Sequence, residues 1–160
     1  MKELTEISYI EEQNGITEAL YLLEERIDAG CDDLETVMRT MFLYWFMFNE
    51  PGYLTNDDGS RDWVKCFRTL FTISLPVYKD NVDFCWVVGY LLSHFHGYAN
   101  LQIEGQELLL RAVQLAPNDP LPTSALTNSR LEMRSLSSEV AKKLSTWGLM
   151  GEFFRYMYCQ

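Results

Sequence analysis

Residues 86–119 read WVVGYLLSHFHGYANLQIEGQELLLRAVQLAPND, and this stretch decides the fold class. Apolar residues recur in it at spacings of three and four, the period of a helix with one buried face. The Gly and Asn residues of its HGYAN segment predict a short turn. The stretch therefore predicts a helical hairpin over about residues 82–119, with a second helix from about 101 to 116.

The same periodicity continues on both sides of the hairpin, and no segment alternates apolar and polar residues with the period of a strand. Gly, Pro and capping residues set the expected ends. We therefore predict an all-α fold, with all 160 residues in one compact helical array or bundle of about seven to nine helices. The first helix of the hairpin is expected over about 81–93, and the further helices over residues 4–13, 16–29, 33–49, 60–75, 124–128, 129–147 and 152–158.

Three helix ends are predicted from particular residues. Asp32 or Asp33 is expected to cap the second long helix, with Glu35 completing a capping box with Asp32. Ser60 is expected to cap the next helix, which Pro76 should end or kink. In the second half, Pro117, Pro120 and Pro122 predict a connector, and Gly148 and Gly151 a break before the last helix.

The charge of the chain is strongly uneven. Residues 1–60 hold 14 acidic and three basic residues, a balance of −11, whereas residues 61–160 hold nine acidic and ten basic residues, a balance of +1. An acidic surface repels nucleic acid and attracts basic partners. We therefore expect a basic protein partner and no direct nucleic-acid binding.

Two acidic segments are the candidate partner-binding face. The first is the loop around residues 50–62 and the start of the helix after it, where acids accompany aromatic residues: Glu50, Tyr53, Asp57, Asp58, Asp62 and Trp63. Aromatic side chains that stay unburied there, including Tyr44, could anchor a partner. The second is the acidic face of the helix over 16–29, with Glu18, Glu24, Glu25 and Asp28.

No catalytic, cofactor or metal motif is found. His94 and His96 are two residues apart and would point away from each other on a helix, so structural histidines are expected there. The paired carboxylates fit a solvated face, and the glycines lack phosphate-loop spacing. We therefore predict a protein that is not an enzyme and uses no cofactor or metal.

The expected location is the bacterial cytoplasm. The longest apolar run, residues 41–48, is shorter than the roughly 20 residues that a membrane span needs. The N-terminus lacks the layout of a signal peptide. Four widely spaced cysteines are expected to be reduced thiols.

The hairpin resembles a tetratricopeptide repeat when it is aligned on Ala112 and Pro117. Leu92, Gly105 and Leu109 match the leucine, small-residue and large apolar positions of that family. It departs from the family where Gly89, Ser93 and His96 replace Trp, a small residue and Tyr. A single copy is found, so the flanking helices are expected to cover its exposed faces.

A small, acidic, helical chain with this hairpin and a Gly-x-x-Gly-Glu-Phe-Phe segment at residues 148–154 resembles bacterial immunity proteins. These are paired with polymorphic toxins such as those of contact-dependent growth inhibition. The resemblance implies that the chain binds and neutralises one cognate toxin C-terminal domain, often a basic nuclease. We expect a monomer when it is unbound.

Two alternatives stay open. One is a tetratricopeptide-like adaptor or secretion chaperone, which would bind a peptide or unfolded segment in a concave groove. The other is an enzyme whose site lies around His94 and His96.

Overall fold

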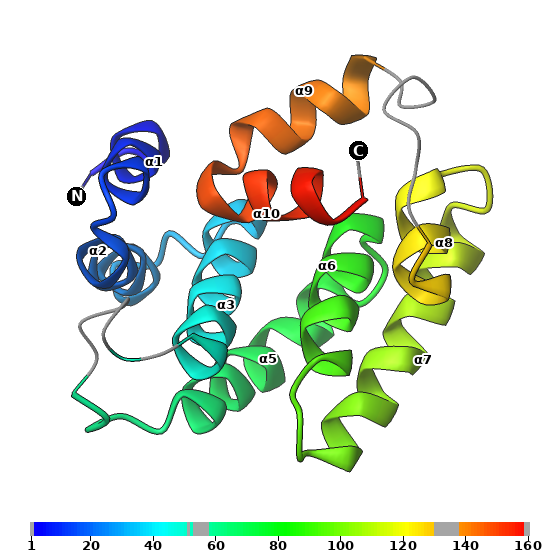
Figure 1. Cartoon of the computed structure of the whole chain (residues 1–160), viewed down its shortest axis with the longest axis horizontal. Helices are drawn as coiled ribbons and strands as arrows, with labels where there is room; N and C mark the ends of the chain where they lie inside the picture. The colour runs from blue at the N-terminus through cyan, green and yellow to red at the C-terminus, as the bar shows by residue number, and fades with distance from the viewer. Residues whose placement is uncertain (1, 51, 53–57, 130–137, 159–160) are drawn as a thin grey trace.

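The computed structural model describes residues 2–50, 52, 58–129 and 138–158. Within these ranges the chain forms helices and no strand, which confirms the all-α prediction (Figure 1). The helices are α1 (Leu4–Glu12), α2 (Ile16–Asp28), α3 (Leu34–Asn49), α5 (Trp63–Tyr78), α6 (Val82–Ser93), α7 (Ala99–Leu115), α8 (Pro120–Thr127), α9 (Ser138–Thr146) and α10 (Gly148–Tyr158).

The start of α3 is capped by one of the two acids that were expected there. Asp33 Oδ1 accepts a hydrogen bond of 3.0 Å from the Thr36 backbone N–H. The predicted capping box between Asp32 and Glu35 is wrong, because Glu35 Oε1 lies 3.3 Å from Arg39 Nη1 on the next turn. An arginine four residues on offers a carboxylate a stronger partner than a single backbone N–H.

Helix α5 begins and ends later than predicted. Asp62, not Ser60, is the cap, and its Oδ1 accepts from the Lys65 backbone N–H at 3.0 Å. The helix also continues through Pro76 to Tyr78. Ser60 instead donates its backbone N–H to Asp58 in the turn before the helix.

The Pro-rich segment is helical, not a connector throughout. Asp119 caps α8, and Pro120 occupies the first helical position, where a missing backbone N–H costs nothing. Pro122 also lies in this first turn, whose N–H groups lack intrahelical acceptors. The last helix, α10, likewise begins earlier than expected, at Gly148, and Gly151 lies inside it. Residues 130–137 of the helix predicted over 129–147 lie outside the described residues, and residues 138–146 form α9.

Two helix pairs stack in the middle of the molecule. Helix α3 packs on α5, α6 packs on α7, and α3 also packs on α6. Ion pairs join the two outer helices α5 and α7, between Arg68 and Glu104 at 2.7 Å and between Arg111 and Asp80 just beyond the end of α5. These ion pairs tie the two helix pairs together along their outer side.

The predicted hairpin is the tightest of these pairs. A Cβ added at Gly105 would lie 2.7 Å from the Gly89 carbonyl oxygen, so only glycine allows this approach of α6 and α7. Gly105 was expected at such a point, whereas Gly89 replaces the family's Trp. The structure confirms a helical hairpin, and its tetratricopeptide character remains a resemblance.

The C-terminal helix α10 closes the core from above (Figure 1). It lies against α1, α3 and α8, and its aromatic side chains reach α3 and α6. Phe154 is fully buried, with its ring centroid 4.7 Å from that of Trp86, and Phe153 contacts Trp45 at 5.3 Å. All the described helices therefore share one hydrophobic core.

The buried carboxylate of Glu11 links α1 both to α3, through an ion pair, and to α10, through a hydrogen bond. Arg39 Nη2 of α3 lies 3.0 Å from Glu11 Oε1 of α1, and the two side chains are 1% and 2% exposed. The other carboxylate oxygen of Glu11 accepts the Leu149 backbone N–H at the start of α10, at 2.8 Å. Arg39 also donates to the Leu4 carbonyl oxygen at 3.2 Å. These contacts fix α1, α3 and α10 against one another.

Candidate partner-binding face

The outer surface of α2 carries a continuous exposed stripe, which we call the α2 stripe: Glu18, Tyr21, Glu25 and Asp28. Their spacings of three, four and three residues place them on one face of the helix. Tyr21 lies among the acids with 55% of its surface exposed. Among the described ion pairs, none includes the three carboxylates of the stripe.

The arginines of the same part of the chain are turned inward. Arg26 is 7% exposed and donates to the Lys2 carbonyl oxygen at 2.9 Å and to Thr36 Oγ1 at 3.3 Å. Arg39 is held in the buried pair with Glu11. Within residues 2–50, Lys2 is the one basic side chain that is exposed. Folding therefore leaves the surface of α2 anionic.

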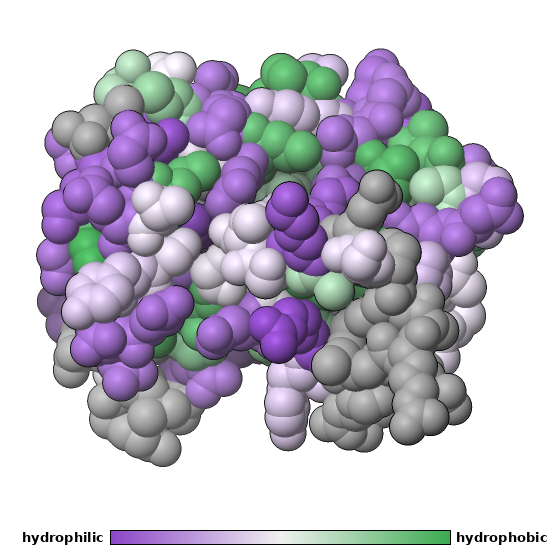
Figure 2. Space-filling view, turned by 90° about the horizontal axis from the view of Figure 1, so that it is seen from above, coloured by the Kyte–Doolittle hydropathy of each residue, from purple (hydrophilic) through white to green (hydrophobic). Residues whose placement is uncertain are grey.

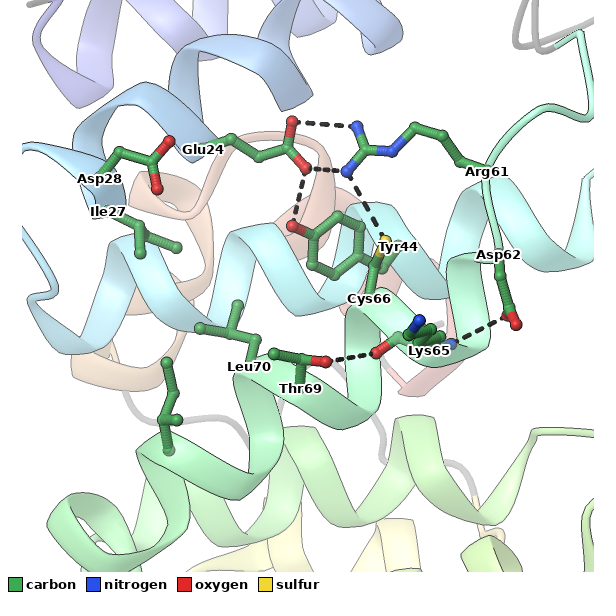
Figure 3. Close-up of a pocket in the computed structure, with 11 residues that line it drawn as sticks. Glu24, Ile27, Asp28, Tyr44, Arg61, Asp62, Lys65, Cys66, Thr69 and Leu70 are labelled. Atoms are coloured by element: carbon green, nitrogen blue, oxygen red, sulfur yellow. Dashed lines mark hydrogen bonds and ion pairs between the residues drawn. The ribbon is translucent and has the colours of Figure 1, made fainter.

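A groove of about 670 Å³ runs between α2 and α5 (Figure 3). Asp28 and Ile27 lie at one end of it, and Asp62 and Lys65 lie at the other. Leu70 and Ile73 of α5 line the apolar part near Asp28. The groove brings together members of both predicted acidic segments, because Asp62 belongs to the first and Asp28 to the second.

Glu24 lies in the middle of the groove and accepts three hydrogen bonds from two neighbours (Figure 3). Arg61 donates to both of its carboxylate oxygens, at 2.6 and 3.1 Å, and Tyr44 Oη donates to Oε1 at 2.7 Å. The guanidinium also lies over the Trp63 ring, 4.7 Å from its centroid, and 3.6 Å from Cys66 Sγ. Glu24 is therefore neutralised by the chain itself.

The titration of this cluster agrees with its geometry. Burial, and then the hydrogen bond to Glu24, raise the pKa of Tyr44 well above its usual 10.0. The hydrogen bonds to Glu24 also raise the pKa of Arg61. The tyrosine therefore stays protonated as a donor, and the arginine stays cationic, so the cluster has the form of a fixed ion pair and not of an acid–base site.

The other predicted residues fall into three groups. Tyr53 and Asp57 lie outside the described residues. Asp58 and Asp62 are exposed, and Glu50 is half-buried. The expectation that Trp63 and Tyr44 are exposed anchors is wrong, since each is 7% exposed and the two rings stack, with centroids 6.2 Å apart.

Two features of this face escaped the sequence analysis. Tyr21 was not singled out, although its spacing from Glu18 and Glu25 already placed it on their side of the helix. Arg61 was not assigned a partner, and no sequence signal links it to Glu24, 37 residues earlier.

His94 packs at the end of α6, and His96 lies beyond it. The Nδ1 atom of His94 lies 2.8 Å from the Tyr90 carbonyl oxygen, and its ring stacks on that of Tyr90 with centroids 4.0 Å apart. Burial lowers the pKa of His94. His96 is exposed. Across the described residues, no three His, Cys, Asp or Glu side chains are placed to hold a metal ion.

No helix in the described ranges has both the length and the apolar character needed to cross a membrane. No family model matches the chain, and neither a curated protein nor a solved structure matches it. The likeness to tetratricopeptide repeats and to immunity proteins therefore rests on the residues quoted above.

Proposed function

We propose that this protein binds a basic protein partner through the α2 stripe and catalyses no reaction itself. In its most concrete form, the proposal is that the chain is an immunity protein that neutralises a cognate toxin C-terminal domain. The observation that carries it is the anionic surface of α2, where Glu18, Glu25 and Asp28 are exposed and form no ion pair with any described residue.

An uncompensated stripe of this kind has a defined physical effect. It draws a cationic partner toward α2 before contact, and so raises the association rate constant most strongly at low ionic strength. A toxin that cleaves nucleic acid needs a cationic cleft for phosphates. An acidic helix that lies over such a cleft would keep the nucleic acid out.

The alternative of an adaptor or secretion chaperone receives less support. Peptide binding in a concave groove would require an accessible surface along α3 and α6. The aromatic residues of α10 already pack there, since Phe153 contacts Trp45 of α3 and Phe154 contacts Trp86 of α6. A peptide could enter only by displacing a helix that belongs to the core.

The test of the proposal is co-expression with a candidate toxin domain. The candidate is the basic C-terminal domain of a large secreted protein encoded next to this chain. We expect cells that express the domain alone to stop growing, and cells that also express this chain to grow. Equal growth arrest with and without the chain would show that the immunity proposal is wrong.

Charge reversal locates the binding face. The double variant Glu18→Lys, Glu25→Lys should lower the association rate constant for the domain by about tenfold or more at low salt, with the difference shrinking as salt rises. The control Glu107→Lys, Glu152→Lys makes the same change in net charge at exposed positions of α7 and α10. Equal effects of the two variants would mean that only net charge matters, and would remove the α2 stripe from the proposal.

A further inference from the structure

We infer that the groove between α2 and α5 is the docking centre for the partner. Its occupant is a segment that places a lysine or arginine on Asp28 and a neighbouring apolar side chain on Leu70 and Ile73. This inference rests on the proposed function and adds to it the chemistry that the partner must present. It follows from the shape, apolar surface and charge of the groove.

The apolar part of the groove is available to a partner. Ile73 is 62% exposed, and Val77, one turn further along α5, is 69% exposed. Leu70 of α5, which is 6% exposed, and Ile27 of α2 also line the groove. Most of the affinity of a protein interface comes from a few anchor residues near its centre, which lose their contact with water on binding. The acids of α2 alone would supply only weak, exposed ion pairs.

Figure 2 shows the face seen from above in Figure 1, where α9 lies, and its surface is mostly hydrophilic with apolar residues in small separate groups. The groove between α2 and α5 places the exposed apolar side chain of Ile73 and the exposed carboxylate of Asp28 in one hollow.

The charges of the groove select a cation at one particular place. Glu24 is already matched by Arg61, whereas Asp28, one helical turn further along α2, is exposed and makes no ion pair within the described part of the chain (Figure 3). At the other end, Lys65 lies close in sequence to Asp62, so that end is nearly neutral. A basic side chain is therefore favoured at Asp28 and not along the whole groove.

The position of Asp28 supports a role outside the helix. It is the last residue of α2, where the helix dipole disfavours a carboxylate. The basic residue of this last turn, Arg26, is turned into the core. A residue that weakens its own helix slightly is typical of a functional position.

The chain also shows that a guanidinium fits this groove. Arg61 makes two hydrogen bonds to Glu24 and lies against Trp63. A partner cation on Asp28 would take the equivalent place one turn along α2, about 5.4 Å away. Since Glu24 neutralises Arg61, the guanidinium of Arg61 repels such a partner cation only weakly.

Point variants test the two halves of the inference, with the candidate toxin domain as the probe. Ile73→Ser should raise the dissociation constant about 30-fold, which corresponds to about 2 kcal/mol and marks a hot spot. Ile103→Ser, at a similarly exposed isoleucine on α7, should leave it within about twofold. Asp28→Asn should raise the constant about tenfold, and the matched Asp32→Asn should not.

Cysteine alkylation tests the location independently. Cys66 lines the groove, and Cys31, which is also partly exposed, lies outside it. Bound toxin domain should slow the reaction of Cys66 with iodoacetamide at least fivefold and leave the rate at Cys31 unchanged. Mass spectrometry of the two tryptic peptides gives both rates in one sample.

The outcomes separate the two proposals. Suppose that the domain binds, that Glu18→Lys, Glu25→Lys weakens binding, and that Ile73→Ser, Asp28→Asn and Cys66 alkylation show no effect. The docking centre would then lie elsewhere on α2, and the proposed function would stand. A domain that binds this chain in no assay would overturn both.

Discussion

Replacing Arg39 by methionine should destabilise the protein severely, because it leaves the buried carboxylate of Glu11 without its cation. Arg39 is 1% exposed and Glu11 2%, and their closest atoms are 3.0 Å apart. Removing one partner of such a pair typically costs about 3–5 kcal/mol. A domain of this size has about 5–15 kcal/mol in total, so the loss takes a large share of its stability.

The expected change is measurable by thermal and urea unfolding followed by circular dichroism. For a chain of this length each kcal/mol lowers Tm by about 2–4 °C, so Arg39→Met should lower it by about 6–20 °C. The double variant Glu11→Gln, Arg39→Met removes both charges. Its glutamine can still accept the Leu149 backbone N–H that Glu11 now accepts at 2.8 Å.

The double variant should therefore be more stable than Arg39→Met alone, by more than about 1 kcal/mol. This ordering is the critical result, because it separates a stranded charge from lost packing of a long side chain. If the double variant is as unstable as the sum of Arg39→Met and Glu11→Gln, the two groups are not coupled. A loss below about 1 kcal/mol in Arg39→Met would equally refute the reasoning.

Two further predictions concern local structure. Gly148→Ala should lower the free energy of unfolding, measured in urea, by at least twice the roughly 1 kcal/mol expected for Gly30→Ala. Both glycines have positive φ, but only at Gly148 would the added Cβ overlap Glu11. Asp33→Asn should make the free energy of unfolding depend less on pH in acid. Burial tends to raise the pKa of Asp33, but the hydrogen bonds from Thr36 outweigh burial and hold that pKa below 3.8. Because the pKa of Asp33 is lower in the folded state, its carboxylate contributes stability above pH 3.8, and this contribution is lost as the pH falls through the folded-state pKa. Unfolding measured against pH should therefore show the variant losing less stability in acid than the natural chain. Parallel curves for the two proteins would contradict this prediction.

The helices themselves could be predicted because their signals are local. The spacing of apolar residues identified α2, α3, α6 and α7, and glycines or capping residues placed most of their ends within a few residues. The errors also have local causes. Pro76 remains inside α5, and Asp62 competes with Ser60 as its cap. Several residues can serve each such role, and packing decides among them.

The candidate site could be predicted only in part. The acids of α2 were identified from their position on the helix, but the groove depends on α5 packing beside them, and no local pattern encodes that. The link between Arg61 and Glu24 spans 37 residues, and that between Glu11 and Leu149 spans 138. Pairs this distant in sequence form because of the topology, and a single sequence carries no periodic signal for them.

Folding sharpens the charge asymmetry that the sequence already contains. Arg26 and Arg39 enter the interior: Arg39 pairs there with the buried Glu11, whereas Asp33, the partner of Arg26, stays exposed. The acids that form no ion pair among the described residues, including Glu18 and Glu25, remain outside. A chain that needed only solubility could have kept its arginines beside these acids on the surface, where exposed pairs form at little cost. Burying both arginines incurs a desolvation penalty and leaves α2 anionic, which is the arrangement expected of a chain that binds the basic partner we propose.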